Sequence, residues 1–330
     1  MKLVSLYSGC GGLDLGFEKA GFKIIWANEF DKNIWSTFER NFPTAKLDKN
    51  DVRKVSSKDI PSADGIIGGP PCQSWSEAGS KRGIKDKRGQ LFFEYVRIIE
   101  DKKPKFFLAE NVSGILHKRH SNAFETIIKS FEDIGYRVTF NLLNASDYSV
   151  PQDRKRVIIV GYREDLGIKF IPPNPIKPKL TLEDSIKDLD GSAVPALQKN
   201  YKNTKNLKYP NHEYYIGDYS SMYMSRNRVR SWDEQSFTIQ AGARHAPIHP
   251  QANKMLFVEK DKRIFDPNSP KPYRRLSVRE CARIQTFPDD FIFDYENVAQ
   301  GYKMIGNAVP VNFAYHLAKK IKKDLEKIDE

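Results

Sequence analysis

Short apolar runs alternate with amphipathic segments over the first 160 residues, and this alternation restricts the possible folds more than any other feature of the chain. Runs rich in branched and apolar residues are typical of buried parallel strands; they cover residues 3–7, 24–27, 65–67, 106–109 and 157–160. Between them, apolar residues recur at helical spacing over residues 13–20, 33–40, 91–101 and 123–134. Strands that alternate with helices are joined by right-handed crossovers. We therefore predict an α/β fold with a doubly wound, mostly parallel sheet.

The regular alternation ends at a cluster of prolines between residues 172 and 178. Few long periodic segments follow until about residue 277, and such a change of texture is typical of a domain boundary. We predict a first domain over residues 1–164, a smaller loop-rich domain over 165–290, and a C-terminal segment over 291–330. This last segment contains a basic amphipathic helix that would pack on the first domain or simply close the chain.

The chain is basic, with 54 Lys and Arg against 42 Asp and Glu, a formal net charge of +12. Residues 201–280 hold fifteen basic residues and eight acidic ones. A local surplus of this kind favours a polyanionic partner, since bound cations release counterions from nucleic acid. The alternative is a basic surface that serves only solubility.

No apolar run is long enough to cross a bilayer, and the run at residues 3–7 is too short for a signal peptide. We therefore expect a cytoplasmic protein without a membrane partner. Cys10, Cys72 and Cys281 are far apart and lack paired spacing. Neither a disulfide framework nor a metal site is indicated.

A glycine-rich turn, Ser8 to Asp14, follows the first predicted strand. Such a turn lets a cofactor approach the backbone at a helix N-terminus, although Asp14 replaces the third glycine of the dinucleotide pattern. Glu29 stands twenty residues after Gly9, where a carboxylate can accept hydrogen bonds from ribose hydroxyls. Asp51 is placed similarly after the next segment. The alternatives are a plain strand-to-helix turn and two helix caps.

A proline-stiffened loop with a cysteine, Gly68 to Ser76, follows the apolar strand at 65–67. The carboxyl ends of the strands are the ligand-binding edge of a doubly wound sheet. Pro70 and Pro71 fix the backbone that enters Cys72, and a stiff approach suits a nucleophile. Taken alone, such a loop is more often a turn beside a buried structural cysteine.

Several motifs occur together in a fixed order: Y-S-G-C-G-G at 7–12, G-P-P-C-Q at 69–73, E-N-V at 110–112, Q-D-R-K-R at 152–156, R-L-S-V-R-E-C-A-R-I-Q-T-F-P at 275–288 and G-N-A-V-P at 306–310. With these motifs the chain resembles the DNA cytosine-C5 methyltransferase family over nearly its whole length. The resemblance implies a Rossmann-like S-adenosylmethionine-dependent methyltransferase fold with a smaller target-recognition domain.

In such an enzyme the Cys72 thiolate would add to C6 of a cytosine, and Glu110 would hold or protonate N3. Arg154 and Arg156 would supply positive charge to the thiolate and grip O2 or a phosphate. The target base would leave the DNA stack, and a mobile loop over residues 73–89 would close on it.

S-adenosyl-L-methionine is the cofactor that the resemblance implies. The family pattern maps cofactor contacts onto Tyr7, Ser8, Gly9, Gly11, Glu29, Phe30, Asp51, Val52, Leu91, Asn307 and Ala308. Tyr7 replaces the phenylalanine that is commoner in this family, Asn50 precedes Asp51 in place of a glycine, and Ala308 replaces a serine. These departures leave the chemistry intact but bear on cofactor affinity.

The resemblance also places double-stranded DNA against Gln73, Ser76 and the region between the fourth and fifth motifs. There, Arg226, Arg228 and Arg230 alternate at period two, so a strand would present their guanidiniums on one face, suited to guanine edges. Arg244 would add a fourth contact. The alternative is a solvated charged face.

The pattern is most similar to the HaeIII-type bacterial modification methyltransferases, which implies the site GGCC and host protection in a restriction-modification system. A restriction endonuclease acting on the same site would be a partner, and we expect a monomer. The rival hypotheses are a transfer-RNA cytosine-C5 methyltransferase and a catalytically silent DNA-binding relative. A dinucleotide oxidoreductase fits the altered glycine pattern less well.

Overall fold

The computed structural model describes residues 1–71, 89–205 and 207–328. Its contacts divide the chain into two units. The first comprises Met1–Asn144, Lys155–Pro175 and Phe313–Glu330, and the second comprises Ala145–Arg154 and Ile176–Asn312.

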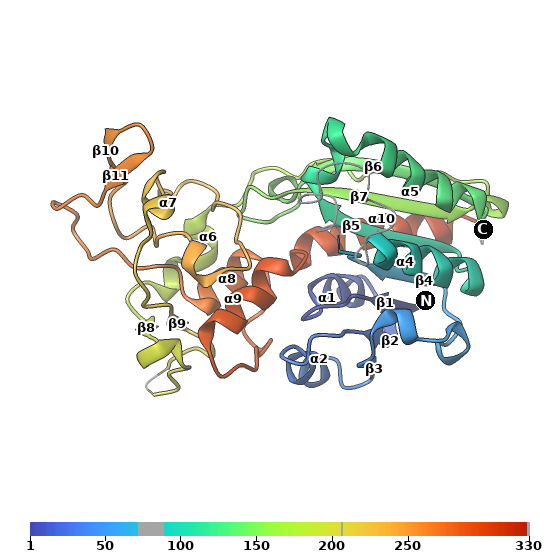
Figure 1. Cartoon of the computed structure of the whole chain (residues 1–330), viewed down its shortest axis with the longest axis horizontal. Coiled ribbons are helices and arrows are strands. Elements are labelled where there is room, and N and C mark those ends of the chain that lie inside the picture. The colour runs from blue at the N-terminus through green and yellow to red at the C-terminus, as the bar shows by residue number, and fades with distance from the viewer. Residues whose placement is uncertain (72–88, 206, 329–330) are drawn as a thin grey trace. The chain divides into compact units, whose positions relative to one another are not determined.

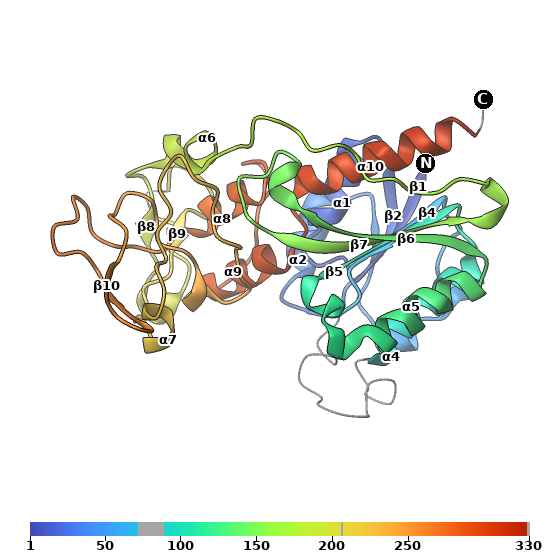
Figure 2. The same cartoon turned by 90° about the horizontal axis from the view of Figure 1, so that it is seen from above.

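A mostly parallel sheet forms the centre of the first unit (Figures 1 and 2). Its order within the described ranges is β3-β2-β1-β4-β5-β7-β6, and β7 alone runs antiparallel to its neighbours. The strands are β1 (Lys2–Leu6), β2 (Lys23–Asn28), β3 (Lys46–Asp48), β4 (Gly65–Gly68), β5 (Phe106–Val112), β6 (Tyr136–Asn144) and β7 (Lys155–Arg163). The predicted fold class is confirmed.

Helices cover both faces of this sheet, and the alternation of side chains along β5 shows how. Phe107 stacks on Phe131 of α5 at 4.1 Å, whereas its neighbour Phe106 stacks on Phe17 of α1 at 6.4 Å. Successive strand residues point to opposite faces. The helices of this unit are α1 (Gly12–Lys19), α2 (Trp35–Asn41), α4 (Gly89–Lys102), α5 (Ser121–Asp133) and α10 (Val311–Glu326).

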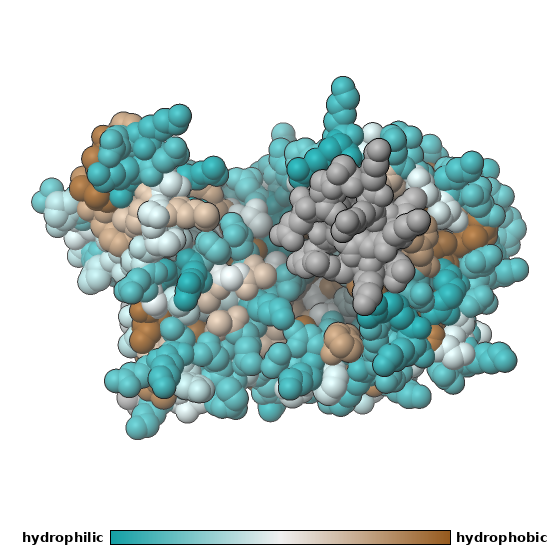
Figure 3. Space-filling view, viewed as in Figure 1, coloured by the Kyte–Doolittle hydropathy of each residue, from teal (hydrophilic) through white to brown (hydrophobic). Residues whose placement is uncertain are grey.

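The second unit has short elements and long connections, as its irregular sequence predicts. Its helices are α6 (Leu182–Ile186), α7 (Ser221–Met224), α8 (Val278–Ile284) and α9 (Val298–Asn307). Two small sheets pair β8 (Val194–Pro195) with β9 (Glu213–Tyr214) and β10 (Leu256–Glu259) with β11 (Lys262–Ile264). The β10–β11 hairpin exposes large apolar side chains, seen in brown at the upper left of Figure 3; they are Leu256, Phe257, Val258 and Ile264.

The unit boundaries differ from the predicted domain limits at 164 and 290. The chain leaves the sheet between β6 and β7, and residues 145–154 join the second unit. There Asp153 N donates to Ser236 O at 3.0 Å. The second unit also continues to residue 312, because α9 packs against α8 rather than leaving with the C-terminal segment. Within the described ranges, no helix combines the length and apolarity that a membrane span needs.

Candidate active site

The loop after β4 leads to the expected nucleophile. Gly68 must be a glycine, since a Cβ there would lie 2.4 Å from the carbonyl oxygen of Leu6. The described chain stops at Pro71, and Cys72, Gln73 and Ser76 lie outside the described residues. The loop begins at the carboxyl end of β4, between β1 and β5, which is the edge where doubly wound sheets bind ligands.

Glu110 on β5 and Arg156 on β7 form an ion pair at this edge. Arg156 Nε lies 2.8 Å from Glu110 Oε1, and the two side chains are 13% and 11% exposed. The strands are adjacent and antiparallel, with Val112 paired to Arg156, so the two side chains meet diagonally. The structure therefore brings together two of the residues that the sequence predicted.

The backbone that enters the loop runs beside this pair. A Cβ on Gly69 would lie 3.6 Å from Glu110 Oε2, and Asn111 Nδ2 donates to the carbonyl of Pro70 at 3.0 Å. Asn111 thus ties the proline turn to β5. Sequence reasoning missed this role, although the E-N-V motif contains the residue.

Arg154 has a different environment from Arg156. Its side chain is 1% exposed and its guanidinium donates to the carbonyls of Ile239, Gly306 and Ala308 at 2.9–3.0 Å. It precedes the first residue of β7 and belongs to the second unit. Backbone carbonyls therefore bind Nη1 and Nη2 of Arg154, whereas Arg156 pairs with Glu110. The expected role of both arginines at the thiolate stays a prediction.

The glycine-rich turn is braced by the acidic residue at the end of β2. Glu29 Oε2 accepts from Gly9 N at 2.9 Å and Oε1 accepts from Asp31 N at 2.6 Å. Burial raises the pKa of Glu29, and the backbone donors partly offset this effect. The Ser8 hydroxyl donates to Asn28 O at 3.3 Å. Glu29 is thus a brace of the turn rather than a helix cap.

The turn has open space for a ligand beside Gly9, whereas the ring of Phe42 fills the space beside Gly11. Gly9 has a φ of +56°, and a Cβ there would meet no atom within 4 Å. Gly11 has a φ of +91°, and a Cβ there would lie 2.1 Å from a ring carbon of Phe42. Phe30 follows Glu29 and is 68% exposed, so its ring is free to stack on a planar ligand. These features fit a nucleoside-containing cofactor.

The remaining cofactor candidates of the first unit have other contacts. The Tyr7 hydroxyl donates to Leu91 O at 2.5 Å, and burial raises its pKa. Asp51 accepts from Arg53 N at 3.1 Å and pairs with the Arg53 guanidinium, which lowers the pKa of the carboxyl. Asp51 therefore caps a short turn, which was the alternative to a cofactor contact. Val52 is buried in the core.

Asn307 and Ala308 stand at the end of α9 in the second unit. Asn307 is exposed and Ala308 is 8% exposed. The preceding Gly306 must be a glycine, because a Cβ would lie 2.2 Å from the backbone carbon of Gln240.

The predicted strand over residues 225–230 is wrong. Only Val229 forms a bridge, to Ile248, and the segment begins as a turn after α7. Asn227 fixes this turn, since its Oδ1 accepts from Met255 N at 3.0 Å and its Nδ2 donates to Val229 O at 2.7 Å. The local bond to Val229 competes with strand pairing, and the bond from Met255 adds a tertiary contact that fixes the turn.

The arginines consequently differ in their contacts. Arg228 donates to the carbonyl oxygens of Met222 and Tyr223, at the carboxyl end of α7. Arg230 pairs with Glu234 at 2.9 Å. Arg226 is exposed, and so is Arg244, whose Nε lies 3.4 Å from the hydroxyl of Tyr215.

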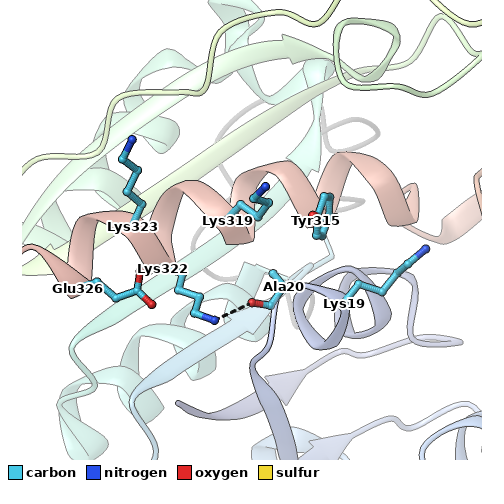
Figure 4. Close-up of a pocket in the computed structure, with 7 residues that line it drawn as sticks. All are labelled: Lys19, Ala20, Tyr315, Lys319, Lys322, Lys323 and Glu326. Atoms are coloured by element: carbon cyan, nitrogen blue, oxygen red, sulfur yellow. Dashed lines mark hydrogen bonds between the residues drawn. The ribbon is translucent and has the colours of Figure 1, made fainter.

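A hollow of about 380 Å³ on the first unit is lined by lysines but is separate from the candidate site. Lys322 reaches from α10 to Ala20 O at the carboxyl end of α1, while Lys323 points to the other side of α10 (Figure 4). The glycine-rich turn precedes α1, so the helix lies between that turn and the hollow.

Comparison with known proteins decides the family. The sequence pattern of the family of C-5 cytosine-specific DNA methylases matches residues 1–323. The chain belongs to this family. It is 62% identical over 326 residues to the Type II methyltransferase M.MthTI of Methanothermobacter thermautotrophicus, covering 99% of this chain and 98% of the relative. It is 57% identical to M.FnuDI of Fusobacterium nucleatum, covering 98% and 95%.

A solved structure shares the fold of this DNA methylase. A prophage-encoded protein of E. coli, assigned as a DNA modification methyltransferase, matches with a TM-score of 0.76 at 24% identity and covers 99% of both chains. This solved structure shows that the chain has the Rossmann-like fold of methyltransferases. The family match and the Type II relatives show that the protein is a DNA cytosine-C5 methyltransferase. The DNA methylase model and the Type II relatives disfavour both the transfer-RNA and the oxidoreductase alternatives.

Proposed function

We propose that this enzyme methylates C5 of a flipped-out cytosine in double-stranded DNA, within GGCC, through a covalent bond between Cys72 and C6. The observation that carries the proposal is the Glu110–Arg156 pair beside Gly69 and Pro70. This pair combines a carboxyl group for the base edge with a cation. It lies beside the backbone at Gly69 and Pro70, and Pro70 is two residues before the expected nucleophile, Cys72.

The proposed reaction begins when the Cys72 thiolate forms a bond to C6 of the cytosine. Negative charge then develops on the ring, and Glu110 holds a proton at N3. Arg156 keeps Glu110 in place and presents positive charge toward O2. C5 becomes nucleophilic and takes the methyl group that S-adenosylmethionine would supply, with S-adenosylhomocysteine as the leaving product. Loss of the C5 proton and cleavage of the Sγ–C6 bond then release methylated DNA and the thiolate.

Cofactor binding is proposed for the glycine-rich turn and the residues near it. Gly9 offers open space to the ligand, Glu29 retains lone pairs for ribose hydroxyls, and Phe30 presents an uncovered ring to the adenine. The family pattern adds further contacts with backbone or side chain; these are Tyr7, Ser8, Gly11, Asp51, Val52, Leu91, Asn307 and Ala308.

DNA recognition is proposed for the exposed arginines of the second unit, with Gln73 and Ser76 contacting the DNA near the target base. Arg226 and Arg244 expose their side chains and suit guanine edges, since an arginine fork pairs with O6 and N7. Arg228 can join them by leaving the end of α7. Arg230 is engaged with Glu234, and we expect it to support the surface instead.

The relatives support a role in a restriction-modification system. Both relatives described above are named Type II methyltransferases. We propose that this enzyme protects its host's DNA from a cognate endonuclease that cuts the same site.

A trapping experiment tests the proposal. The enzyme is incubated with S-adenosylmethionine and a GGCC duplex that carries 5-fluorocytosine at the target. Fluorine at C5 cannot leave as a proton does, so the covalent complex should persist through denaturing electrophoresis. We expect an adduct with the native enzyme and none with Cys72→Ser.

Two further substrates complete the experiment. A duplex with one altered base pair in the site should yield far less adduct, and transfer RNA should not be methylated. Methylation of transfer RNA without any on duplex DNA would overturn the proposed substrate. Equal trapping on unrelated duplexes would overturn GGCC but leave the chemistry standing.

A further inference from the structure

Arg154 lies at the centre of a buried hydrogen-bond network, the bracket, which joins segments far apart in the sequence. Its Nη1 donates to Ile239 O at 3.0 Å, and its Nη2 donates to Gly306 O at 2.9 Å and Ala308 O at 3.0 Å. The two carbonyls at the end of α9 flank Asn307 on either side. A planar guanidinium is suited to this task, because it presents several donors in a fixed fork.

Two glutamines complete the bracket. Gln152 Oε1 accepts from Ile239 N at 2.8 Å, and its Nε2 donates to Gln285 Oε1 at 2.9 Å. Gln285 Nε2 in turn donates to Ile305 O at 2.8 Å. Both glutamines are fully buried. The N–H and the carbonyl of Ile239 are therefore both bound by the bracket, so this residue is a fixed anchor for the end of α9.

Close backbone packing gives the bracket little freedom. A Cβ on Gly306 would lie 2.2 Å from the backbone carbon of Gln240 and 2.4 Å from the N of Ala241. The same stretch of chain continues to the exposed Arg244. The end of α9 is thus fixed against the backbone at Gln240 and Ala241, and this arrangement determines the position of the exposed Asn307.

We propose that Arg154 is a positioning residue that holds Asn307 and Ala308 in their cofactor-binding geometry, and that it takes no part in activating the thiolate. The inference rests on the proposed function, which assigns Asn307 and Ala308 to the cofactor. Two arginines of one motif then have separate tasks. Arg156 touches Glu110 and acts on the rate of reaction, whereas Arg154 acts on cofactor affinity.

The test compares Arg154→Lys with a matched control, Arg279→Lys. Arg279 is also fully buried in the second unit and donates to the carbonyl oxygens of Pro210, Pro288 and Phe291. Among the residues that the structure describes, it makes no hydrogen bond or ion pair with residues 305–308. A lysine in place of either arginine lacks the forked guanidinium and its several donors, so both variants should lose stability in thermal unfolding.

Cofactor affinity separates the two variants. Binding of S-adenosylhomocysteine is measured by titration calorimetry below the unfolding temperature of every variant. We expect Arg154→Lys to raise Kd roughly tenfold or more, since small displacements of a positioned group have effects of this size. Arg279→Lys should stay within about twofold of the native enzyme. In kinetics, Arg154→Lys should raise KM for S-adenosylmethionine more than it lowers kcat, and Arg156→Lys should do the reverse.

Asn307→Ala distinguishes failure of this inference from failure of the proposed function. If Asn307→Ala weakens binding and Arg154→Lys behaves like Arg279→Lys, the positioning role is wrong and the proposed cofactor contact survives. If Asn307→Ala binds normally, the proposed contact is wrong and the inference falls with it. Should Arg154→Lys not fold, Gln152→Leu opens the same bracket and carries the same expectations.

Discussion

Arg156 Nε lies 2.8 Å from Glu110 Oε1 across the paired strands β5 and β7, while Glu110 Oε2 faces the backbone at Gly69. One carboxylate oxygen is therefore fixed by a cation and the other is directed toward the loop that carries Cys72. A side chain held in place before the reaction needs no reorganisation when charge develops on the substrate. This geometry is the basis for the first expected outcome.

Glu110→Gln should lower the rate of methyl transfer by about 10²- to 10⁴-fold, because an amide cannot supply the N3 proton in the same way. Arg156→Lys should lower it less, since a lysine keeps the charge but loses the fixed geometry. Single-turnover measurements on a GGCC duplex would check both. Arg163→Lys is the control on the same strand, because its partner is the exposed Asp165 at 2.7 Å. A rate for Glu110→Gln close to that of this control would contradict the assigned role.

The sequence predicted the elements of the first unit well because their periodicity is local. Phe124, Ile127 and Phe131 lie on one face of α5 and are buried, as their spacing indicates. The direction of β7 could not be read in the same way, since an apolar strand has the same pattern in a parallel or antiparallel pairing. The edge strand β6 was also missed, and it exposes Phe140 and Leu142.

Site residues were predictable where a motif and its strand coincide, and less so where distant contacts decide. Glu110 lies within β5, so the motif and the sheet give the same position. Arg154 differs from Arg156 by two residues in sequence, yet its partners are 85 to 154 residues away. The prediction of a strand over residues 225–230 was wrong for a similar reason, because Asn227 binds Met255 and fixes a turn. Tertiary contacts overrode the local pattern in both cases.

Glu280 and Arg274 form a buried pair whose disruption should destabilise the second unit. The two side chains make two hydrogen bonds of 2.8 Å, and both Glu280 and its partner are almost fully buried. Burial alone would raise the pKa of Glu280, but Arg274 lowers it to about 2. Glu280→Gln leaves a buried guanidinium without its counter-charge, which should cost about 3–5 kcal/mol in urea unfolding. Glu259→Gln is the control, since its exposed pair with Lys262 should contribute less than about 1 kcal/mol.

His249 should make the stability of the protein depend on pH in the acidic range. Burial lowers its pKa from 6.5 to about 4, although Glu280 nearby opposes the shift and Arg274 adds to it. The unfolded chain binds a proton below about pH 6.5, whereas the folded chain does so only near pH 4. The stability that comes from keeping His249 neutral is therefore fully present above pH 6.5 and is lost as the pH falls toward 4.

Replacing His249 should remove that part of the pH dependence. Between pH 7 and pH 4.5, the free energy of unfolding of His249→Gln should fall by up to a few kcal/mol less than that of the native protein. Urea unfolding at a series of pH values would show this. His117→Gln, at an exposed histidine, should keep the native profile. Identical profiles for both variants would show that His249 does not carry the effect.

Asp14 should lower the stability of the first unit as the pH rises from about 4 to about 7. Its carboxyl group is fully buried in the first turn of α1, close to the hydroxyl of Ser5. Burial raises the pKa to about 7. The unfolded chain loses this proton near pH 4 and the folded chain only near 7, so stability is lost as the pH rises between them. Asp14→Asn should therefore raise Tm at pH 8 and have little effect at pH 4. A variant that is less stable than the native protein at pH 8 would contradict this account.

Arg226 and Arg230, four residues apart, should respond differently to replacement by alanine. Arg226 is exposed and makes no hydrogen bond or ion pair within the described ranges, so Arg226→Ala should leave Tm nearly unchanged. It should lower discrimination between GGCC and a site with one altered base pair by about 1–3 kcal/mol. Arg230 pairs with Glu234 and stacks on Phe237, so Arg230→Ala should lower Tm and leave the ratio of the two affinities nearly intact. Competition binding with the two duplexes at fixed salt would measure that ratio, because the loss of a phosphate contact would weaken both affinities alike. If Arg230→Ala abolished discrimination and Arg226→Ala did not, the exposed arginine would not be the one that reads the base.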